Sequence, residues 1–255
     1  AGIAAAGSEK MTKGFGPLLP GFVHLKWNDH DAIKAAISDK TAAIMIEPIQ
    51  GEGGIRSVPE HCLRGLRDLC DEHGLLLIFD EVQCGVGRTG KLFAHEWAGV
   101  DPDIMMVAKG IGGGFPLGAV LASEEAAFGM TTGTHGSTYG GNPLGCAVGN
   151  KVLELVGDTD FLDEVAEKAT YFKAGLQDLV ARHPNTFKSM RGKGLMMGLE
   201  CAVPNMNFVN AGYDALILTV PAGDNVVRFV PALTITKNEI DEALARLSSA
   251  AQSLG

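Results

Sequence analysis

The chain has 255 residues, of which 46% are hydrophobic and 20% are charged, as is typical of a folded globular protein. Its formal net charge of −9 and the lack of a dense Lys/Arg run argue against a nucleic-acid partner. No apolar run is long enough to cross a bilayer, so we expect no membrane partner. The five cysteines are odd in number and form no close Cys-x-x-Cys pair, which favours a reducing, cytoplasmic location.

The first part of the chain predicts alternating helices and strands. It begins at Ala1 without an initiating methionine, and we expect it to be part of a longer protein. Asn28 and Asp29 can cap a short helix, and residues 42–47 read as a buried strand that ends at a proline. A further helix over residues 59–74 leads directly into the next apolar run. This order indicates parallel strands joined by right-handed crossovers.

Two short apolar runs each end in a residue of interest for chemistry. Residues 75–79 are followed by Asp80, and residues 105–108 are followed by Lys109. Short apolar runs bounded by turn residues are typical of buried parallel strands. Ligands of open α/β sheets bind at the carboxyl ends of such strands. We therefore expect a carboxylate and an amine to face the same crevice.

A pyridoxal phosphate enzyme needs this pair of groups. Its lysine forms a Schiff base with the cofactor aldehyde, and an acid beside the pyridine nitrogen keeps that nitrogen protonated. The same pair could serve a Schiff-base aldolase that needs no cofactor. Taken singly, Lys109 could be a loop lysine and Asp80 a helix cap, so the two residues alone leave these alternatives open.

Residues 85–90 fit the Gly-x-Gly-x-x-Gly pattern of dinucleotide-binding proteins. That pattern should open a helix, but residues 91–97 predict only a short, weak one, which argues against NAD. Residues 85–91 also contain most of a nucleotide phosphate-binding loop, but Leu92 replaces the Ser or Thr that would hold magnesium. No group of histidines and cysteines has a known zinc spacing, so no metal site is predicted.

The second part of the chain changes in pattern near residue 158. Residues 116–122 predict one more strand, the polar segment 133–143 predicts a loop, and Asn142 and Pro143 open a helix that reaches Val156. We then expect a helix over 161–181, strands over 194–201, 216–220 and 226–230, and a helix after Thr236. This predicts two domains, residues 1–157 and 158–255, the second smaller and of α+β type.

Five segments resemble, in order, motifs of the class III, fold-type I, pyridoxal-phosphate-dependent aminotransferases. They are residues 47–54 (EPIQGEGG), 79–90 (FDEVQCGVGRTG), 108–110 (AKG), 135–143 (HGSTYGGNP) and 227–231 (VRFVP). The resemblance covers essentially the whole chain and is strongest to the acetylornithine-specific branch. It implies the α/β fold of that family, with a large domain of mostly parallel sheet and flanking helices, and a smaller C-terminal α+β domain. The N-terminal part of the family fold is expected to lie ahead of Ala1.

The resemblance also implies roles around the cofactor, pyridoxal 5′-phosphate. Lys109 would bind the cofactor and later carry a proton, and Asp80 would pair with the protonated pyridine nitrogen. Val82 would pack against one ring face, and Gln83 would donate a hydrogen bond to the ring oxygen.

Four further residues receive roles from the same resemblance. Thr138, with Ser137 beside it, would bind the cofactor phosphate of a neighbouring subunit, which implies a homodimer with shared sites. Arg228 would bind the α-carboxylate of 2-oxoglutarate or glutamate, because a guanidinium matches a carboxylate bidentately. Glu52 would neutralise Arg228 when the amine donor enters. A plain structural salt bridge between Glu52 and Arg228 is the alternative.

The implied reaction moves the terminal amino group of N-acetylornithine to 2-oxoglutarate and gives N-acetylglutamate 5-semialdehyde and glutamate, a step of arginine biosynthesis. Other amino donors remain open, namely succinylornithine, ornithine and 4-aminobutyrate. An inactive interaction fragment is the alternative from outside the enzyme class.

Overall fold

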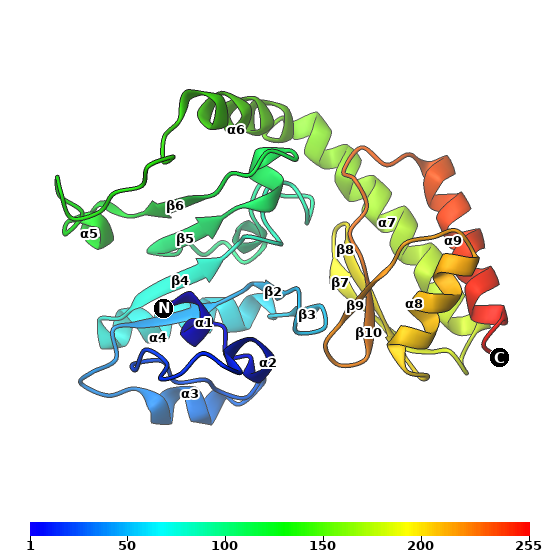
Figure 1. The fold of residues 1–255 in the computed structure, drawn as a ribbon, viewed down its shortest axis with the longest axis horizontal. Coiled ribbons are helices and arrows are strands. Elements are labelled where there is room, and N and C mark those ends of the chain that lie inside the picture. The colour runs from blue at the N-terminus through cyan, green and yellow to red at the C-terminus, as the bar shows by residue number, and fades with distance from the viewer. The chain divides into compact units, whose positions relative to one another are not determined.

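The computed structural model describes residues 1–255, which divide into two compact units, Ala1–Ala42 and Ala43–Gly255 (Figure 1). The regular elements of the first unit are three short helices, α1 (Gly2–Ala5), α2 (Glu9–Thr12) and α3 (His30–Ala36). The carboxylate of Asp29 accepts a hydrogen bond from the Ala32 N–H at 3.0 Å. This confirms the predicted cap of α3, since an aspartate before the first turn satisfies a free backbone donor.

A four-stranded sheet in the order β1-β4-β5-β6 forms the first half of the second unit. Its strands are β1 (Ala43–Ile46), β4 (Leu76–Asp80), β5 (Ile104–Val107) and β6 (Ala119–Ala122). Strands β1, β4 and β5 run parallel, and β6 is an antiparallel edge strand. Leu77 and Phe79 alternate along β4 and are both fully buried. The predicted mostly parallel sheet is therefore confirmed.

Short strands and helices connect this sheet. They are β2 (Ile49–Gln50), β3 (Arg56–Ser57), α4 (Glu60–His73), the 3₁₀ helices Ala94–Trp97 and Lys109–Gly112, α5 (Glu124–Ala127) and α6 (Pro143–Val156). Helix α4 ends at Gly74, whose φ of +63° is the left-handed conformation that glycine adopts without a Cβ clash. Helix α6 begins as predicted, because the Asn142 side chain accepts from the Gly145 N–H at 2.8 Å and Pro143 occupies the first turn.

A second four-stranded sheet in the order β7-β8-β10-β9 follows, and its strands are antiparallel. Its strands are β7 (Phe187–Lys193), β8 (Met196–Cys201), β9 (Val220–Ala222) and β10 (Val226–Phe229), and its helices are α7 (Thr159–Arg182), α8 (Asn205–Asp214) and α9 (Lys237–Gln252). The three helices cover one face of the sheet (Figure 1). Leu176, Leu199 and Ile240 are fully buried between these layers. Phe187 and Phe208 meet edge to face, with ring centroids 4.9 Å apart.

Part of the predicted pattern in this region was wrong. Residues 216–219, of which the first three are apolar, form a connection, and β9 begins only at Val220. The reason lies in the pairing: β9 has partners on β10 only from Val220 onward, and Leu216 and Leu218 are 78% and 83% exposed. Strand β7 and helix α8 were not predicted. The domain boundary at 157/158 falls between α6 and α7 and stays a prediction.

Candidate active site

Three charged residues emerge at the carboxyl edge of the parallel sheet. Asp80 is the last residue of β4, Glu47 directly follows β1, and Lys109 lies two residues after β5. Ile46 pairs with Phe79 across the two parallel strands, so Glu47 and Asp80 leave the sheet side by side. The charges of Asp80 and Lys109 both act on the carboxyl of Glu47. The structure therefore brings the predicted acid and amine to one edge.

Asp80 and Lys109 each have a side-chain polar atom without a hydrogen-bond partner in this chain. Oδ1 of the half-buried Asp80 accepts from the Val82 N–H at 2.9 Å, and its Oδ2 has no hydrogen-bond partner. Lys109 is exposed, and its amine forms no hydrogen bond or ion pair. Its φ of +48° is uncommon for a residue with a Cβ, and such backbone strain gathers at functional sites. The edge thus presents an accessible amine and an open carboxylate oxygen.

Glu47 is a site residue that the sequence analysis missed. Its Oε2 accepts from the Gly51 N–H at 3.0 Å. Burial raises the pKa of Glu47, and the charge of Asp80 adds to this, while the Gly51 N–H and the Lys109 amine oppose it. A usable signal was present, because Glu47 directly follows a short apolar strand, much as Asp80 ends one.

Arg228 on β10 lies in contact with Glu52 and Gln83. Its Nη1 donates to Glu52 Oε1 at 2.6 Å and to Gln83 Oε1 at 2.7 Å. Arg228 is only 8% exposed, and its buried Nε has no partner. The Glu52 side chain is 70% exposed, and the hydrogen bond from Arg228 holds the pKa of its carboxyl below the usual range. The positive charge of the buried Arg228 guanidinium is therefore neutralised by Glu52, a carboxylate that solvent can reach. The guanidinium also retains donors that no group in this chain uses.

Val82 and Gln83 follow Asp80 directly, and both are half-buried. A Cβ on Gly51 would lie 2.1 Å from Gln83 Oε1, so a larger residue there would displace the Gln83 amide from its present position.

Ser137 and Thr138 lie in a loop of which residues 131–140 are all exposed. The Ser137 hydroxyl accepts from the Gly140 N–H at 3.0 Å. No hydrogen bond links either residue to Asp80 or Lys109 within this chain. Within this chain, the structure therefore does not join these two residues to the strand-edge site by hydrogen bonds.

Glu81 is a fully buried carboxylate directly behind the site, and its role was not predicted. Its oxygens accept from the backbone N–H groups of Ala94 and His95 at 2.9 and 2.8 Å and from the Cys84 thiol at 3.2 Å. Burial raises the pKa of Glu81, and these donors oppose that rise. Glu81 thus ties the segment after β4 to the 3₁₀ helix Ala94–Trp97.

We expect the substitution Glu81→Gln to lower the free energy of unfolding by about 1–3 kcal/mol, since its amide group cannot accept from all these buried donors. Urea unfolding followed by fluorescence measures the change. Glu72→Gln, at an exposed position on α4, is the control and should leave the midpoint unchanged. Equal midpoints for the two variants would contradict a stabilising role of Glu81.

The glycine-rich segment 85–90 has a packing role in the structure. A Cβ on Gly87 would lie 2.5 Å from Val156 Cγ1, and the residue has a φ of +78°. Burial lowers the pKa of Arg88 to about 10, and its guanidinium donates to the carbonyls of Leu195 and Pro231. The glycines therefore let this segment lie against α6 and the second sheet.

The chain matches the aminotransferase class-III family over residues 1–251. It belongs to the class III aminotransferase family. Among its relatives is the acetylornithine aminotransferase of Rhodobacter capsulatus, which is 66% identical over 254 residues, or 100% of this chain and 65% of that protein. The acetylornithine aminotransferase of Mesorhizobium japonicum is 58% identical over 99% of this chain and 63% of its own length. This class III chain thus spans slightly less than two thirds of these relatives.

Solved structures of ornithine and N-acetylornithine aminotransferases share the fold. An ornithine aminotransferase from Toxoplasma gondii, with partial occupancy of PLP at its active site, has a TM-score of 0.90 at 33% identity and covers 97% of this chain and 60% of its own. The N-acetylornithine aminotransferase of Stenotrophomonas maltophilia has a TM-score of 0.82 at 36% identity, and the match covers 90% of this chain and 62% of that protein. The fold implied by the class III resemblance is therefore confirmed. None of the helices has the length and apolar character needed to span a bilayer.

Proposed function

We propose that the protein carrying this chain is a pyridoxal-phosphate-dependent aminotransferase that moves the terminal amino group of N-acetylornithine to 2-oxoglutarate, in arginine biosynthesis. The observation that carries the proposal is the emergence of Asp80 and Lys109 at one carboxyl edge of the parallel sheet. The identity of 66% to an acetylornithine aminotransferase supports this choice of donor.

The donor set at the strand edge fits pyridoxal 5′-phosphate. When bound, this group supplies an aldehyde that reacts with amines and a ring that accepts electrons from the substrate carbon. The unpaired amine of Lys109 suits the covalent link, and the open Oδ2 of Asp80 suits a protonated ring nitrogen. Its likeness to a Toxoplasma gondii enzyme that contains PLP adds support.

Each residue at this edge then has a stated task. Lys109 would hold the cofactor through Nζ, and its amine would move a proton at the substrate carbon. Asp80 would keep the ring nitrogen protonated, because a nearby carboxylate favours the charged form. Val82 would pack against the ring, and Gln83 would donate a hydrogen bond to the ring oxygen. Gln83 Oε1 accepts a hydrogen bond from Arg228. Gln83 would therefore link the cofactor to the arginine that binds the substrate carboxylate.

The pair of Glu52 and Arg228 lets one site take substrates of different charge. Arg228 binds the α-carboxylate of 2-oxoglutarate or glutamate with its planar donors, and Glu52 moves aside. When the amine donor enters, Glu52 returns and neutralises the buried guanidinium. The exposure of the Glu52 side chain, at 70%, gives it room to leave, whereas Arg228 stays buried.

We expect Glu52→Ala to shift the ratio of the two half-reaction rates about tenfold toward glutamate, because Arg228 stays free for a carboxylate. Single-turnover absorbance measurements with N-acetylornithine and with glutamate give this ratio. Glu154→Ala removes an exposed ion pair with Lys151 on α6 and is the control. An unchanged ratio in Glu52→Ala would mean that Glu52 and Arg228 form only a structural salt bridge.

We also propose a homodimer with shared sites, in which Ser137 and Thr138 bind the cofactor phosphate of the neighbouring subunit. Their exposure in this chain supports such a role. Large apolar side chains nearby support an interface, since Val120, Phe128 and Tyr139 are 69%, 84% and 82% exposed. A cytoplasmic location agrees with five unpaired cysteines.

The proposed donor is tested by single-turnover reactions of the purified, cofactor-loaded protein. The panel contains N-acetylornithine, succinylornithine, ornithine and 4-aminobutyrate, each followed by the loss of absorbance of the lysine-bound cofactor. We expect N-acetylornithine to have the highest ratio of rate to half-saturation concentration. A higher ratio for another amine would replace the donor and leave the aminotransferase assignment intact.

A further inference from the structure

The turn between β9 and β10 lies directly against the loop that carries Glu52. The Gly223 N–H donates to the backbone carbonyl of Glu52 at 2.8 Å. A Cβ on Gly54 would lie 2.7 Å from the Gly223 carbonyl oxygen, so the two backbones are in close contact. The position of Glu52 therefore depends on this turn.

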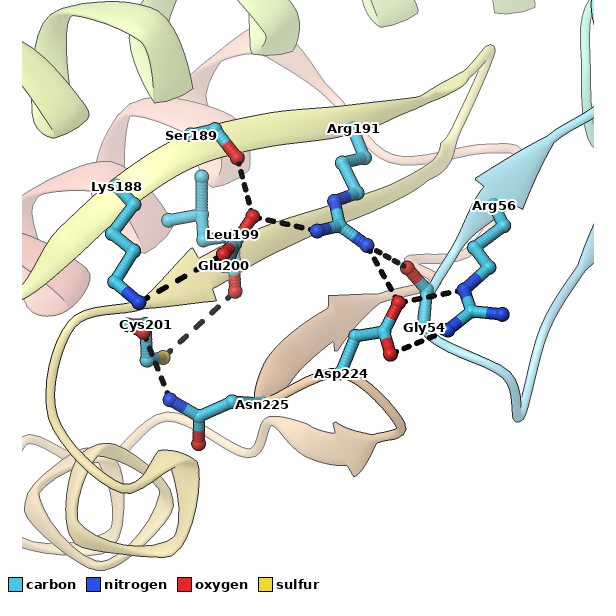
Figure 2. A network of polar contacts seen from close by, with 10 residues as sticks. All are labelled: Gly54, Arg56, Lys188, Ser189, Arg191, Leu199, Glu200, Cys201, Asp224 and Asn225. Carbon is cyan, nitrogen blue, oxygen red and sulfur yellow. Dashed lines mark hydrogen bonds and ion pairs between the residues drawn. The ribbon is translucent and has the colours of Figure 1, made fainter. Parts of the chain in front are cut away.

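A group of ionic side chains, here called the Asp224 cluster, surrounds the same contact (Figure 2). It consists of Asp224, Arg56, Arg191 and Glu200. Arg56 donates to both oxygens of Asp224, from Nε at 2.6 Å and from Nη2 at 2.5 Å. Arg191 Nη1 donates to Asp224 Oδ2 at 3.1 Å, and Arg191 Nη2 donates to Glu200 Oε2 at 2.6 Å. Bidentate pairs of this kind set orientation as well as energy.

The cluster also reaches the loop backbone. Arg191 Nη1 donates to the Gly54 carbonyl at 3.4 Å, and Arg56 lies on β3, just after the loop (Figure 2). The four side chains are between 25% and 33% exposed, so solvent screens them only in part. The hydrogen bond from Arg56 holds the pKa of Asp224 below its usual range, and Arg191 adds to this effect. Asp224 is thus charged at neutral pH.

The same two segments are joined a second time at the candidate active site. Glu52 lies in the loop before β3, and Arg228 lies on β10, four residues after Asp224. One ion pair, Glu52–Arg228, must break and reform in the proposed reaction. The other, Arg56–Asp224, touches no proposed substrate group and can persist throughout. The Asp224 cluster can therefore hold the loop backbone in place while the Glu52 side chain moves.

We propose that Asp224 is a positioning residue that holds the Glu52 loop where its carboxylate can reach Arg228, and so sets the balance between the two half-reactions. This inference rests on the proposed exchange of Glu52 for a substrate carboxylate. Without the cluster, the loop gains freedom and Glu52 pairs with Arg228 less often. Arg228 is then more often free to bind a carboxylate, so the balance shifts toward glutamate.

The test compares Asp224→Asn with a matched control. Asparagine keeps the size of the side chain and tolerates the φ of +54° at this position, so the turn is retained. Glu242→Gln on α9 removes an ion pair in which Nε and Nη2 of Arg246 both donate to Glu242 Oε1, and is the control. We expect Asp224→Asn to shift the half-reaction ratio about threefold toward glutamate, as for loss of a partly exposed ion pair. Glutarate, a dicarboxylate that cannot react, should bind about threefold more tightly by calorimetry, and Glu242→Gln should change neither value.

The double variant with Glu52→Ala separates positioning from general stability. If Asp224 acts through Glu52, adding Asp224→Asn to Glu52→Ala produces no further shift. Additive shifts, or equal slowing of both half-reactions with unchanged glutarate affinity, would overturn the inference and leave the proposed function standing. If Glu52→Ala alone leaves the ratio unchanged, the proposed exchange fails and this inference fails with it.

Discussion

Replacing Lys109 with alanine is expected to remove the absorbance of the lysine-bound cofactor. We expect the rate of transamination to fall by about 10²- to 10⁴-fold, which is the typical contribution of one positioned acid–base group. The expectation follows from the position of Lys109 at the carboxyl edge, with an amine that no other side chain engages. No nearby group can take over its task, because Asp80, Glu47 and Glu52 are all carboxylic acids.

The effect of Lys109→Ala should be confined to chemistry. Its amine makes no hydrogen bond or ion pair, so we expect the melting temperature without cofactor to stay unchanged. Lys91→Ala is the matched control, since Lys91 is an exposed lysine whose Nζ lies 5.5 Å from the Trp97 ring centroid. Retained absorbance in Lys109→Ala, or its loss in Lys91→Ala, would assign the covalent link to a residue other than Lys109.

The second large effect is expected for Asp80→Asn, which should lower turnover by about 10²- to 10³-fold, the loss typical when one preorganised partner of a developing charge is removed. An amide cannot keep the pyridine nitrogen protonated as a carboxylate does. The substitution leaves the local fold intact, because an asparagine oxygen can still accept from the Val82 N–H, as Asp80 Oδ1 does at 2.9 Å.

The absorbance of the bound cofactor separates this effect from a loss of binding. We expect Asp80→Asn to retain the Lys109-linked absorbance, with a shift in wavelength, while turnover falls. Asp101→Asn changes an exposed carboxylate just before β5 and is the control. Turnover of Asp80→Asn close to that of the control would remove Asp80 from the cofactor site.

Features that depend on neighbours in the chain were predictable from the sequence. The cap at Asn142 and the helix start after Thr236 are confirmed, because a side-chain oxygen there satisfies backbone donors three residues ahead. The strand over Leu76–Asp80 is confirmed for a similar reason, since a short apolar run bounded by turn residues favours burial in a sheet. The placement of Asp80 and Lys109 at strand ends follows from these local patterns.

Features that depend on distant partners were not predictable from local pattern. Strand β7 is mostly polar and only partly buried, and it is a strand because β8 supplies its backbone hydrogen bonds. The connection 216–219 contains three apolar residues yet forms no strand, because no neighbouring strand pairs with it.

By itself, the sequence determined the parallel strands, the helix caps and the two strand-end residues, since each depends on hydrophobic burial and hydrogen bonding among near neighbours. The Glu52–Arg228 pair, separated by 176 residues, was suggested only by family resemblance. The tertiary structure alone decided that the Asp224 cluster joins this region. Charges this far apart in sequence meet only when both sheets have formed, because the cost of bringing the segments together is met by the buried core.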